Sequence, residues 1–106
     1  MSQKEFFKIL GKEGHDRLRI RLQIDKGELT NIVVQYESFI DNKWTAIVRY
    51  DIEHGFFHRD MMTPKGEKIK TPIEIPDFNS AIIYAEQDIK DKWEHYKQRY
   101  LKGKKK

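Results

Sequence analysis

Residues 49–60 read RYDIEHGFFHRD, and this stretch determines the strand register of the fold. Polar and apolar residues alternate in residues 49–53, before His54 and Gly55, which is the pattern of a half-buried strand, and residues 56–63 are predicted to form the strand that follows the turn. Glycine adopts positive φ freely, so a two-residue hairpin turn is predicted at these two positions. In this register two pairs of complementary side chains lie opposite one another on one face, Asp51 with His58 and Arg49 with Asp60.

The other face of the predicted hairpin is apolar. It carries Val48, Tyr50, Ile52, Phe57 and Met61. Continuing the alternation toward the N-terminus places Trp44 and Ala46 on this apolar face as well. Exposed apolar surface is unfavourable in water, so a helix is expected to cover this face.

Outside the hairpin, residues 17–24 read RLRIRLQI and alternate strictly between polar and apolar side chains. Such alternation predicts a strand with one buried face. Pro72 lacks an N–H donor, so the last strand of the chain is placed at a sheet edge. Residues 3–10, QKEFFKIL, fit either a short helix or an irregular arm. The remaining strands are predicted at residues 29–40, 44–52, 56–63 and 68–75.

After Pro76 the apolar period changes from that of a strand to that of a helix. Asp77 is the predicted N-cap, because its carboxylate can accept hydrogen bonds from the first helical turn. Gly103 is predicted to end the helix. Seven apolar or aromatic residues form one narrow stripe along it: Phe78, Ile82, Ala85, Ile89, Trp93, Tyr96 and Tyr100.

These elements predict an α+β fold. A five-stranded antiparallel sheet, mostly a meander, has the long C-terminal amphipathic helix packed on one face. The chain has 106 residues, which fits a single domain over residues 1–106. Within it the sheet is expected in 15–75, the helix in 77–101 and a basic tail in 102–106.

The charge of the chain is concentrated at one end. The net charge is +4, but residues 102–106 read KGKKK, and without them 17 basic residues balance 17 acidic ones. The tail is expected to be either a solvated end or an arm that attracts phosphates. The chain has no cysteine and no apolar run suited to a signal peptide or a membrane span. A cytoplasmic protein without a membrane partner is therefore predicted.

The polar face of the hairpin is the candidate site. A carboxylate beside His58 would orient the ring, so that one ring nitrogen can act as general acid or base near neutral pH. Asp51 is then the orienting partner, Arg49 a phosphate contact and His54 an auxiliary group at the turn. The pattern indicates metal-independent cleavage of RNA, or binding of RNA, with no cofactor. Four further residues extend the predicted binding surface: Arg17, Arg19, Arg21 and Asp60.

The same residues leave two other interpretations open. The charged pairs can serve only to fix the strand register, in which case the protein is a non-catalytic interaction module that forms a homodimer or holds a protein partner. A metal site is the third interpretation, because two imidazoles and two carboxylates lie close in sequence at Asp51, His54, His58 and Asp60. The segment GKEG is too short for a phosphate-binding loop, and no G-x-S-x-G motif occurs.

The stretch VVQYESFIDNKWTAIVRYDIEHGFFHRD resembles a family of small uncharacterised bacterial and archaeal proteins. The shared pattern is V-Q-Y-E, then R-Y-D-x-x-H-G-x-x-H-x-D, then a C-terminal helix reading DIKDKWEHYKQRY. The strand with R-Y-D and the histidines after it is also similar to the TumE-type toxins of toxin–antitoxin pairs. That resemblance implies action on RNA and a cognate protein partner. This chain has His54 and His58 apart, where those toxins have closely paired histidines.

Overall fold

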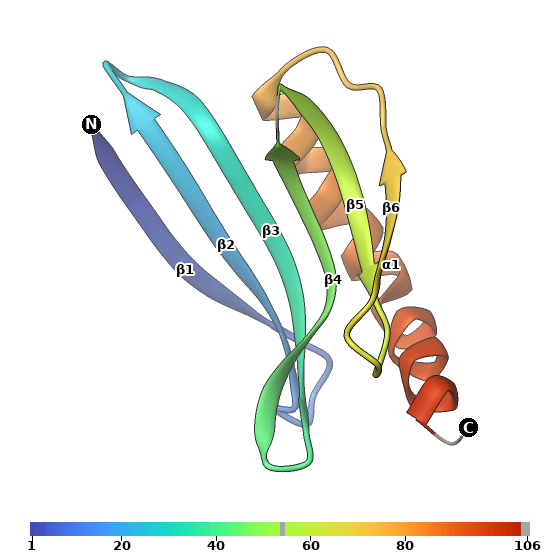
Figure 1. The fold of residues 1–106 in the computed structure, drawn as a ribbon. Coiled ribbons are helices and arrows are strands. Elements are labelled where there is room, and N and C mark those ends of the chain that lie inside the picture. Colours follow the sequence, from blue (N-terminus) through green and yellow to red (C-terminus); the bar gives the residue numbers. More distant parts are fainter. Residues whose placement is uncertain (54, 105–106) are drawn as a thin grey trace.

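The computed structural model describes residues 1–53 and 55–104, and within them it contains one antiparallel sheet and one helix (Figure 1). The helix α1 spans Phe78–Lys104. The predicted α+β meander with a C-terminal helix is confirmed, with six strands in place of five. The strands follow one another across the sheet in chain order: β1 Ser2–Leu10, β2 Asp16–Asp25, β3 Glu28–Ile40, β4 Lys43–Glu53, β5 Phe56–Met62 and β6 Lys68–Pro72.

The strand that the sequence did not reveal is β1. It pairs with β2 along its whole length, from Ser2 opposite Ile24 to Leu10 opposite Asp16. Only Leu10 is buried, because β1 is an edge strand and the rest of it is exposed on both faces. A strand that buries neither face needs no alternation of apolar and polar residues. Its structure is therefore determined by pairing with β2 and not by a local pattern.

The predicted start of the helix is confirmed, whereas its predicted end is wrong. Asp77 Oδ1 accepts a hydrogen bond from the Ser80 N–H at 2.7 Å, which confirms the N-cap. Gly103 does not end the helix, which continues to Lys104, and the Lys104 ammonium pairs with Asp41. A Cβ atom at position 103 would lie 3.1 Å from a ring carbon of Pro64. Glycine at this position therefore permits close packing and does not act as a stop signal.

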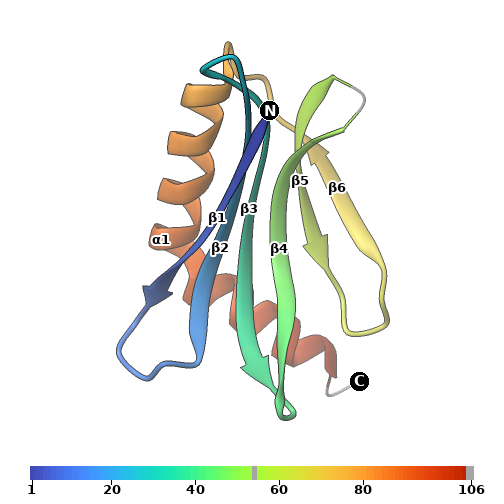
Figure 2. The same ribbon diagram turned by 90° about the vertical axis from the view of Figure 1, so that its left-hand side faces the viewer.

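The core lies between α1 and the sheet, where the helix packs mainly against β3 and also touches β4 (Figure 2). The predicted apolar face is confirmed for Val48, Tyr50 and Phe57, which are buried there. Two small helix residues, Ala81 and Ala85, are fully buried and let the helix approach the sheet closely. The other core residues include Leu18, Ile20, Ile32, Val34, Tyr36, Ile89 and Tyr96.

Buried hydrogen bonds also connect the helix to the sheet. The hydroxyl groups of Tyr50 and Tyr96 both donate to Asp88 Oδ2, each at 2.6 Å. Tyr36 donates to Asp16 Oδ1 at 2.6 Å, and the Lys97 ammonium lies 3.2 Å from the other oxygen of Asp16. Burial and the hydrogen bond to Asp88 together raise the pKa of Tyr96 to about 12. These tyrosines therefore remain protonated donors at neutral pH.

A β-bulge in β4 changes which residues share a face. Tyr36 lies opposite Val48, but Glu37 lies opposite Ala46, so Ile47 is the extra residue. One extra residue reverses the alternation beyond it. Trp44 is opposite Phe39 on the face away from the helix, and the prediction that Trp44 and Ala46 share the apolar face is wrong.

Candidate functional site on the open face of the sheet

We call the sheet face away from α1 the open face. In Figure 1 the helix lies behind β4 and β5, so this face is turned toward the viewer. Two rows of directly opposed residues cross it from β1 to β6. The first row is Phe7, Arg19, Gln35, Arg49, Asp60 and Lys70, and the second is Glu5, Arg21, Val33, Asp51, His58 and Pro72.

The open face brings together the predicted site residues of β2, β4 and β5. Arg17 lies beside the two rows, opposite Glu37 of β3. The prediction for His54 lies outside the described residues. The predicted hairpin register is confirmed, since Asp51 lies opposite His58 and Arg49 opposite Asp60.

Asp51, His58 and Asp60 form a compact group that we call the Asp–His–Asp cluster. His58 Nε2 lies 2.8 Å from Asp51 Oδ1 and 3.4 Å from Asp60 Oδ2. The predicted pairing of Asp51 with His58 is therefore confirmed. The cluster comes from neighbouring strands, β4 and β5, so the hairpin register alone places its three side chains on one face.

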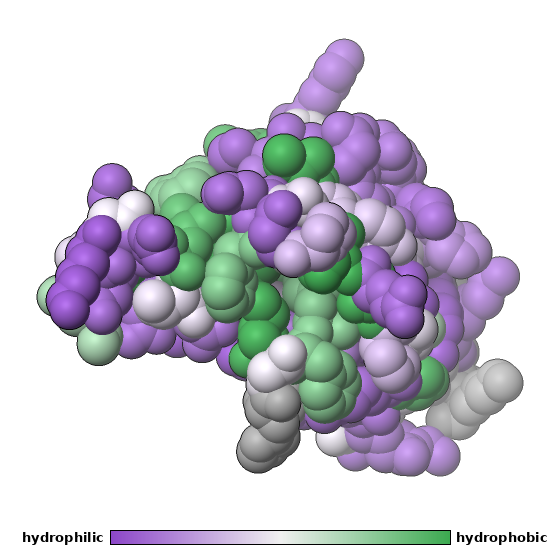
Figure 3. Space-filling model, turned by 90° about the horizontal axis from the view of Figure 1, so that it is seen from above, coloured by the Kyte–Doolittle hydropathy of each residue, from purple (hydrophilic) through white to green (hydrophobic). Residues whose placement is uncertain are grey.

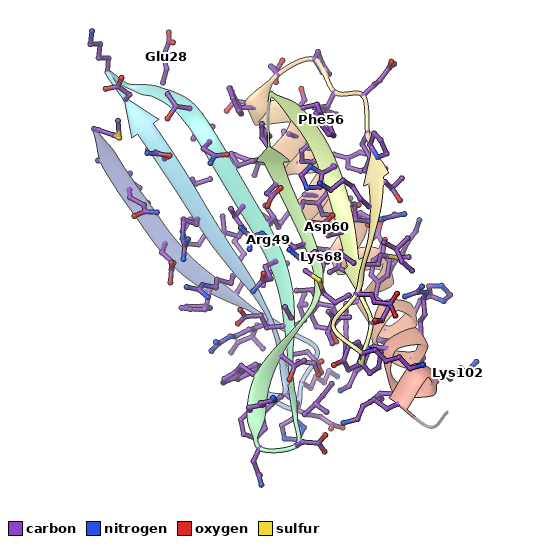
Figure 4. All side chains as sticks on the ribbon, viewed as in Figure 1. Glu28, Arg49, Phe56, Asp60, Lys68 and Lys102 are labelled. Carbon is purple, nitrogen blue, oxygen red and sulfur yellow. The ribbon has the colours of Figure 1, made fainter. Side chains whose placement is uncertain are left out.

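The predicted ion pair between Arg49 and Asp60 is wrong. Arg49 Nε instead donates to Asp51 Oδ2 at 2.8 Å, and within the described chain no ion pair joins Arg49 to Asp60. Asp51 lies two residues further along the same strand and hence on the same face as Arg49. Asp60 turns toward His58. Figure 4 shows Arg49 and Asp60 near the middle of the sheet, with Phe56 toward the hairpin end.

The cluster is buried although no helix covers it. His58 is 0% and Asp60 3% exposed, and the Phe56 ring lies 5.6 Å from the His58 ring, centroid to centroid. The side chain of Asp51 is 15% exposed and that of Arg49 37%. A ligand from solvent would therefore meet Arg49 and Asp51 first.

A second feature of the open face is the arginine–aromatic patch, which consists of Phe7, Arg17, Phe39 and Trp44. The guanidinium carbon of Arg17 lies 4.3 Å from the Phe7 ring centroid and 3.9 Å from that of Trp44. Phe39 packs edge-on against Trp44 at 5.4 Å. Phe7 is 49% and Trp44 38% exposed, so both rings remain available to a ligand. Sequence reasoning missed this patch because Phe7 lies in the unpredicted β1 and the bulge turns Trp44 to this face.

A polar hollow of about 250 Å³ forms the third feature. Arg21 and Arg49 both line it, so it adjoins the Asp–His–Asp cluster through Arg49. Arg21 Nε lies 3.1 Å from Glu5 Oε2, and hydrogen bonds from Arg19 and Arg21 hold the pKa of Glu5 below its usual value. The other lining residues are Gln3, Gln23, Asn31, Ile32 and Val33.

The arginines of the open face are matched by carboxylates. Arg17 Nε donates to Glu37 Oε1 at 2.8 Å, and Glu37 is buried. Arg19 and Arg21 share Glu5, and Arg49 contacts Asp51. The four predicted cationic residues therefore do not form an unbalanced positive surface.

A separate apolar cleft of about 940 Å³ lies at the hairpin end of the molecule. Figure 3, which views this end from above, shows hydrophobic side chains in a hollow between hydrophilic ones. The cleft contains none of the predicted site residues that the structure describes. It is lined by Ile52, Gly55, Phe56, Phe57 and residues 72–78.

Fold and site together define a small α+β protein whose helix covers one face of a meander sheet and whose other face carries a partly buried polar site. The chain belongs to the family described as "Domain of unknown function (DUF7718)", whose model matches residues 1–106. No curated protein and no solved structure matches the chain. Across residues 1–53 and 55–104, no helix has the length and apolar character needed to cross a membrane.

Proposed function

We propose that this DUF7718 protein binds single-stranded RNA across the open face of its sheet. One observation carries the proposal: two exposed aromatic rings, Phe7 and Trp44, flank an arginine on a sheet surface that no helix covers. Unpaired bases stack on exposed aromatic side chains and on guanidinium planes, and antiparallel sheets are a common platform for this.

The polar hollow supplies contacts of a second kind. Arg21 and Arg49 each engage a carboxylate through Nε, which uses one of the five donors of a guanidinium. The remaining donors suit a phosphate or a base edge. Amide side chains at Gln3, Gln23 and Asn31 line the same hollow and can both donate and accept hydrogen bonds.

Charge balance on the open face determines the kind of binding to expect. Because carboxylates neutralise the arginines, few counterions would be released when RNA binds. Stacking then provides most of the affinity. We expect weak salt dependence, with a slope of log K against log salt of about −1 to −2, well below that of a protein with six or more phosphate contacts.

The ribonuclease form of this proposal gives His58 the role of general acid or base, with Asp51 as orienting partner and Arg49 as phosphate contact. The 2.8 Å approach of His58 to Asp51 suits that orientation. A general acid or base must also reach the substrate directly or through one water, and His58 is fully buried. The geometry therefore favours binding over cleavage.

The test measures fluorescence anisotropy of a labelled single-stranded oligoribonucleotide titrated with the full chain. Replacing Phe7 with alanine is expected to weaken binding about tenfold, since one stacked base contributes about 1–3 kcal/mol. Phe6 is the matched control, because it is 39% exposed on the same strand but on the opposite face. Phe6→Ala should bind within about twofold of the parent.

Equal loss in both variants, or no binding by the parent at low salt, would contradict the proposal. A parent that binds no RNA but forms a stable dimer by light scattering would favour the interaction-module interpretation. Incubation of the oligonucleotide with the parent in chelator, followed by gel analysis, tests for metal-independent cleavage separately.

A further inference from the structure

We infer that the Asp–His–Asp cluster is a binding site for a divalent transition-metal ion. One donor atom from each of Asp51, His58 and Asp60 lies within 4.8 Å of the other two. The His58 Nε2 atom is 2.8 Å and 3.4 Å from the nearest oxygens of the two carboxylates. Donors bound at about 2.1 Å to one ion are about 3.0–3.4 Å apart in octahedral or tetrahedral geometry, so small side-chain adjustments would admit the ion.

The buried oxygens of the cluster support this inference independently. Only 3% of the Asp60 surface is exposed to solvent. Among the described residues its Oδ1 atom has no hydrogen-bond partner. Asp51 Oδ1 accepts no aligned hydrogen bond within the same part of the chain, although it is close to His58. Buried carboxylate oxygens without an aligned donor are unfavourable, and a cation would satisfy both of these oxygens.

Arg49 acts on this site through Asp51. Its Nε–H group holds Asp51 Oδ2 at 2.8 Å, which leaves Oδ1 directed toward His58. Hydrogen bonds of this kind orient the carboxylates that bind metals in proteins. Arg49 is therefore a positioning residue and not a ligand.

The donor set indicates the class of ion. Two carboxylates favour harder cations and one imidazole favours borderline ones, so the combination suits Mn²⁺, Fe²⁺ or Zn²⁺ better than Mg²⁺ or Ca²⁺. Three protein donors leave further coordination positions for water or a ligand. The inference does not depend on RNA binding, because it concerns the ion alone.

The experiment uses the full chain, freed of any metal-affinity tag, stripped with chelator and then dialysed. Loss of the free-ion electron paramagnetic resonance signal during Mn²⁺ titration should give about one site per chain, and Zn²⁺ should compete for it. At about 100 times the dissociation constant, Mn²⁺ should raise the midpoint of thermal unfolding by on the order of 10 °C, with a smaller effect of Mg²⁺.

Asp60→Asn keeps the shape of the side chain and removes the charge, so it should abolish Mn²⁺ binding. Asp51→Asn provides a second variant if Asp60→Asn does not fold. His95→Gln removes an exposed imidazole of α1 and should bind as the parent does. Absence of any Mn²⁺ or Zn²⁺ binding by the parent overturns the inference. So does parent-like binding by folded Asp60→Asn and Asp51→Asn, or loss of binding in His95→Gln alone.

Discussion

Aspartate side chains are largely buried on both faces of the sheet, but the two faces differ in how completely these carboxylates are hydrogen-bonded. On the helix side, Asp88 accepts hydrogen bonds from two tyrosine hydroxyls, and Asp16 has a tyrosine and a lysine as partners. On the open face, Asp51 and Asp60 each keep a buried oxygen without a hydrogen bond among the described residues. The burial is similar, whereas the number of buried oxygens left without a hydrogen bond among the described residues is not.

This difference bears on what each buried carboxylate contributes to the stability of the folded chain. A buried carboxylate with complete hydrogen bonding stabilises the packing around it, and most buried polar groups in proteins are of this kind. A buried carboxylate with an unused oxygen destabilises the folded chain unless a ligand supplies the missing partner. Asp88 and Asp16 therefore stabilise the fold, and Asp51 and Asp60 are the carboxylates of the proposed metal site.

The most direct test of this difference between the faces is to replace one aspartate on each face and compare the loss of stability. Asp88→Ala should lower the free energy of unfolding by about 3–4 kcal/mol, because two buried tyrosine hydroxyls lose their acceptor. Asp60→Asn in chelator should change it by less than about 1 kcal/mol or raise it, since an incompletely bonded charge is removed. Urea denaturation measures both values. A loss at Asp60 as large as that at Asp88 would show that the two faces are equivalent.

Alkaline titration tests the contribution of the buried tyrosine hydroxyls on the helix side. Burial and hydrogen bonding raise the pKa of Tyr96 to about 12, and the same causes raise the pKa of Tyr36 and of Tyr50. An unfolded tyrosine loses its proton near pH 10, so the folded chain binds more protons above that pH and its stability falls. Tyr96 alone should account for about 2 kcal/mol of lost stability between pH 10 and 12.

The measurement is the urea midpoint followed from pH 8 to 12. Tyr96→Phe should show a shallower decline above pH 10 than the parent, because one group that binds protons preferentially in the folded state is gone. An identical decline in both chains would place the alkaline sensitivity elsewhere.

The smallest expected effect concerns the arginine–aromatic patch. Arg17→Lys keeps the charge opposite Glu37 but loses the planar contact with Phe7 and Trp44, so the free energy of unfolding should fall by about 1 kcal/mol. Arg99→Lys on the exposed side of α1 is the control and should change it by less than about 0.5 kcal/mol. Equal effects would mean that the rings do not stabilise Arg17.

Much of the fold could be predicted because its signals are local. Alternation in residues 17–24 and 48–52 and the helical period after Pro76 each reflect burial of one face. The glycine at position 55, with φ of 85°, favoured the tight turn that sets Asp51 opposite His58. The edge strand β1 buries almost nothing, so its sequence carried no comparable pattern.

The site was harder to predict because it depends on tertiary detail. The bulge at Ile47 inserts one residue without a glycine or proline to mark it, and it alone turns Trp44 to the open face. The ion-pair partner of Arg49 could not be predicted from the strand register either. The register correctly placed Arg49 opposite Asp60, but the choice of Asp51 as the ion-pair partner depends on side-chain geometry within one strand.

Arg49 occupies a position shared by two neighbouring parts of the open face, since it lines the polar hollow and also fixes the carboxylate of Asp51. An anion that draws its guanidinium toward the hollow would release that carboxylate and change how well the cluster holds a cation. By thermodynamic reciprocity, filling the cluster would alter the affinity for the anion by the same factor. One side chain would thus make the occupancy of each location depend on the other.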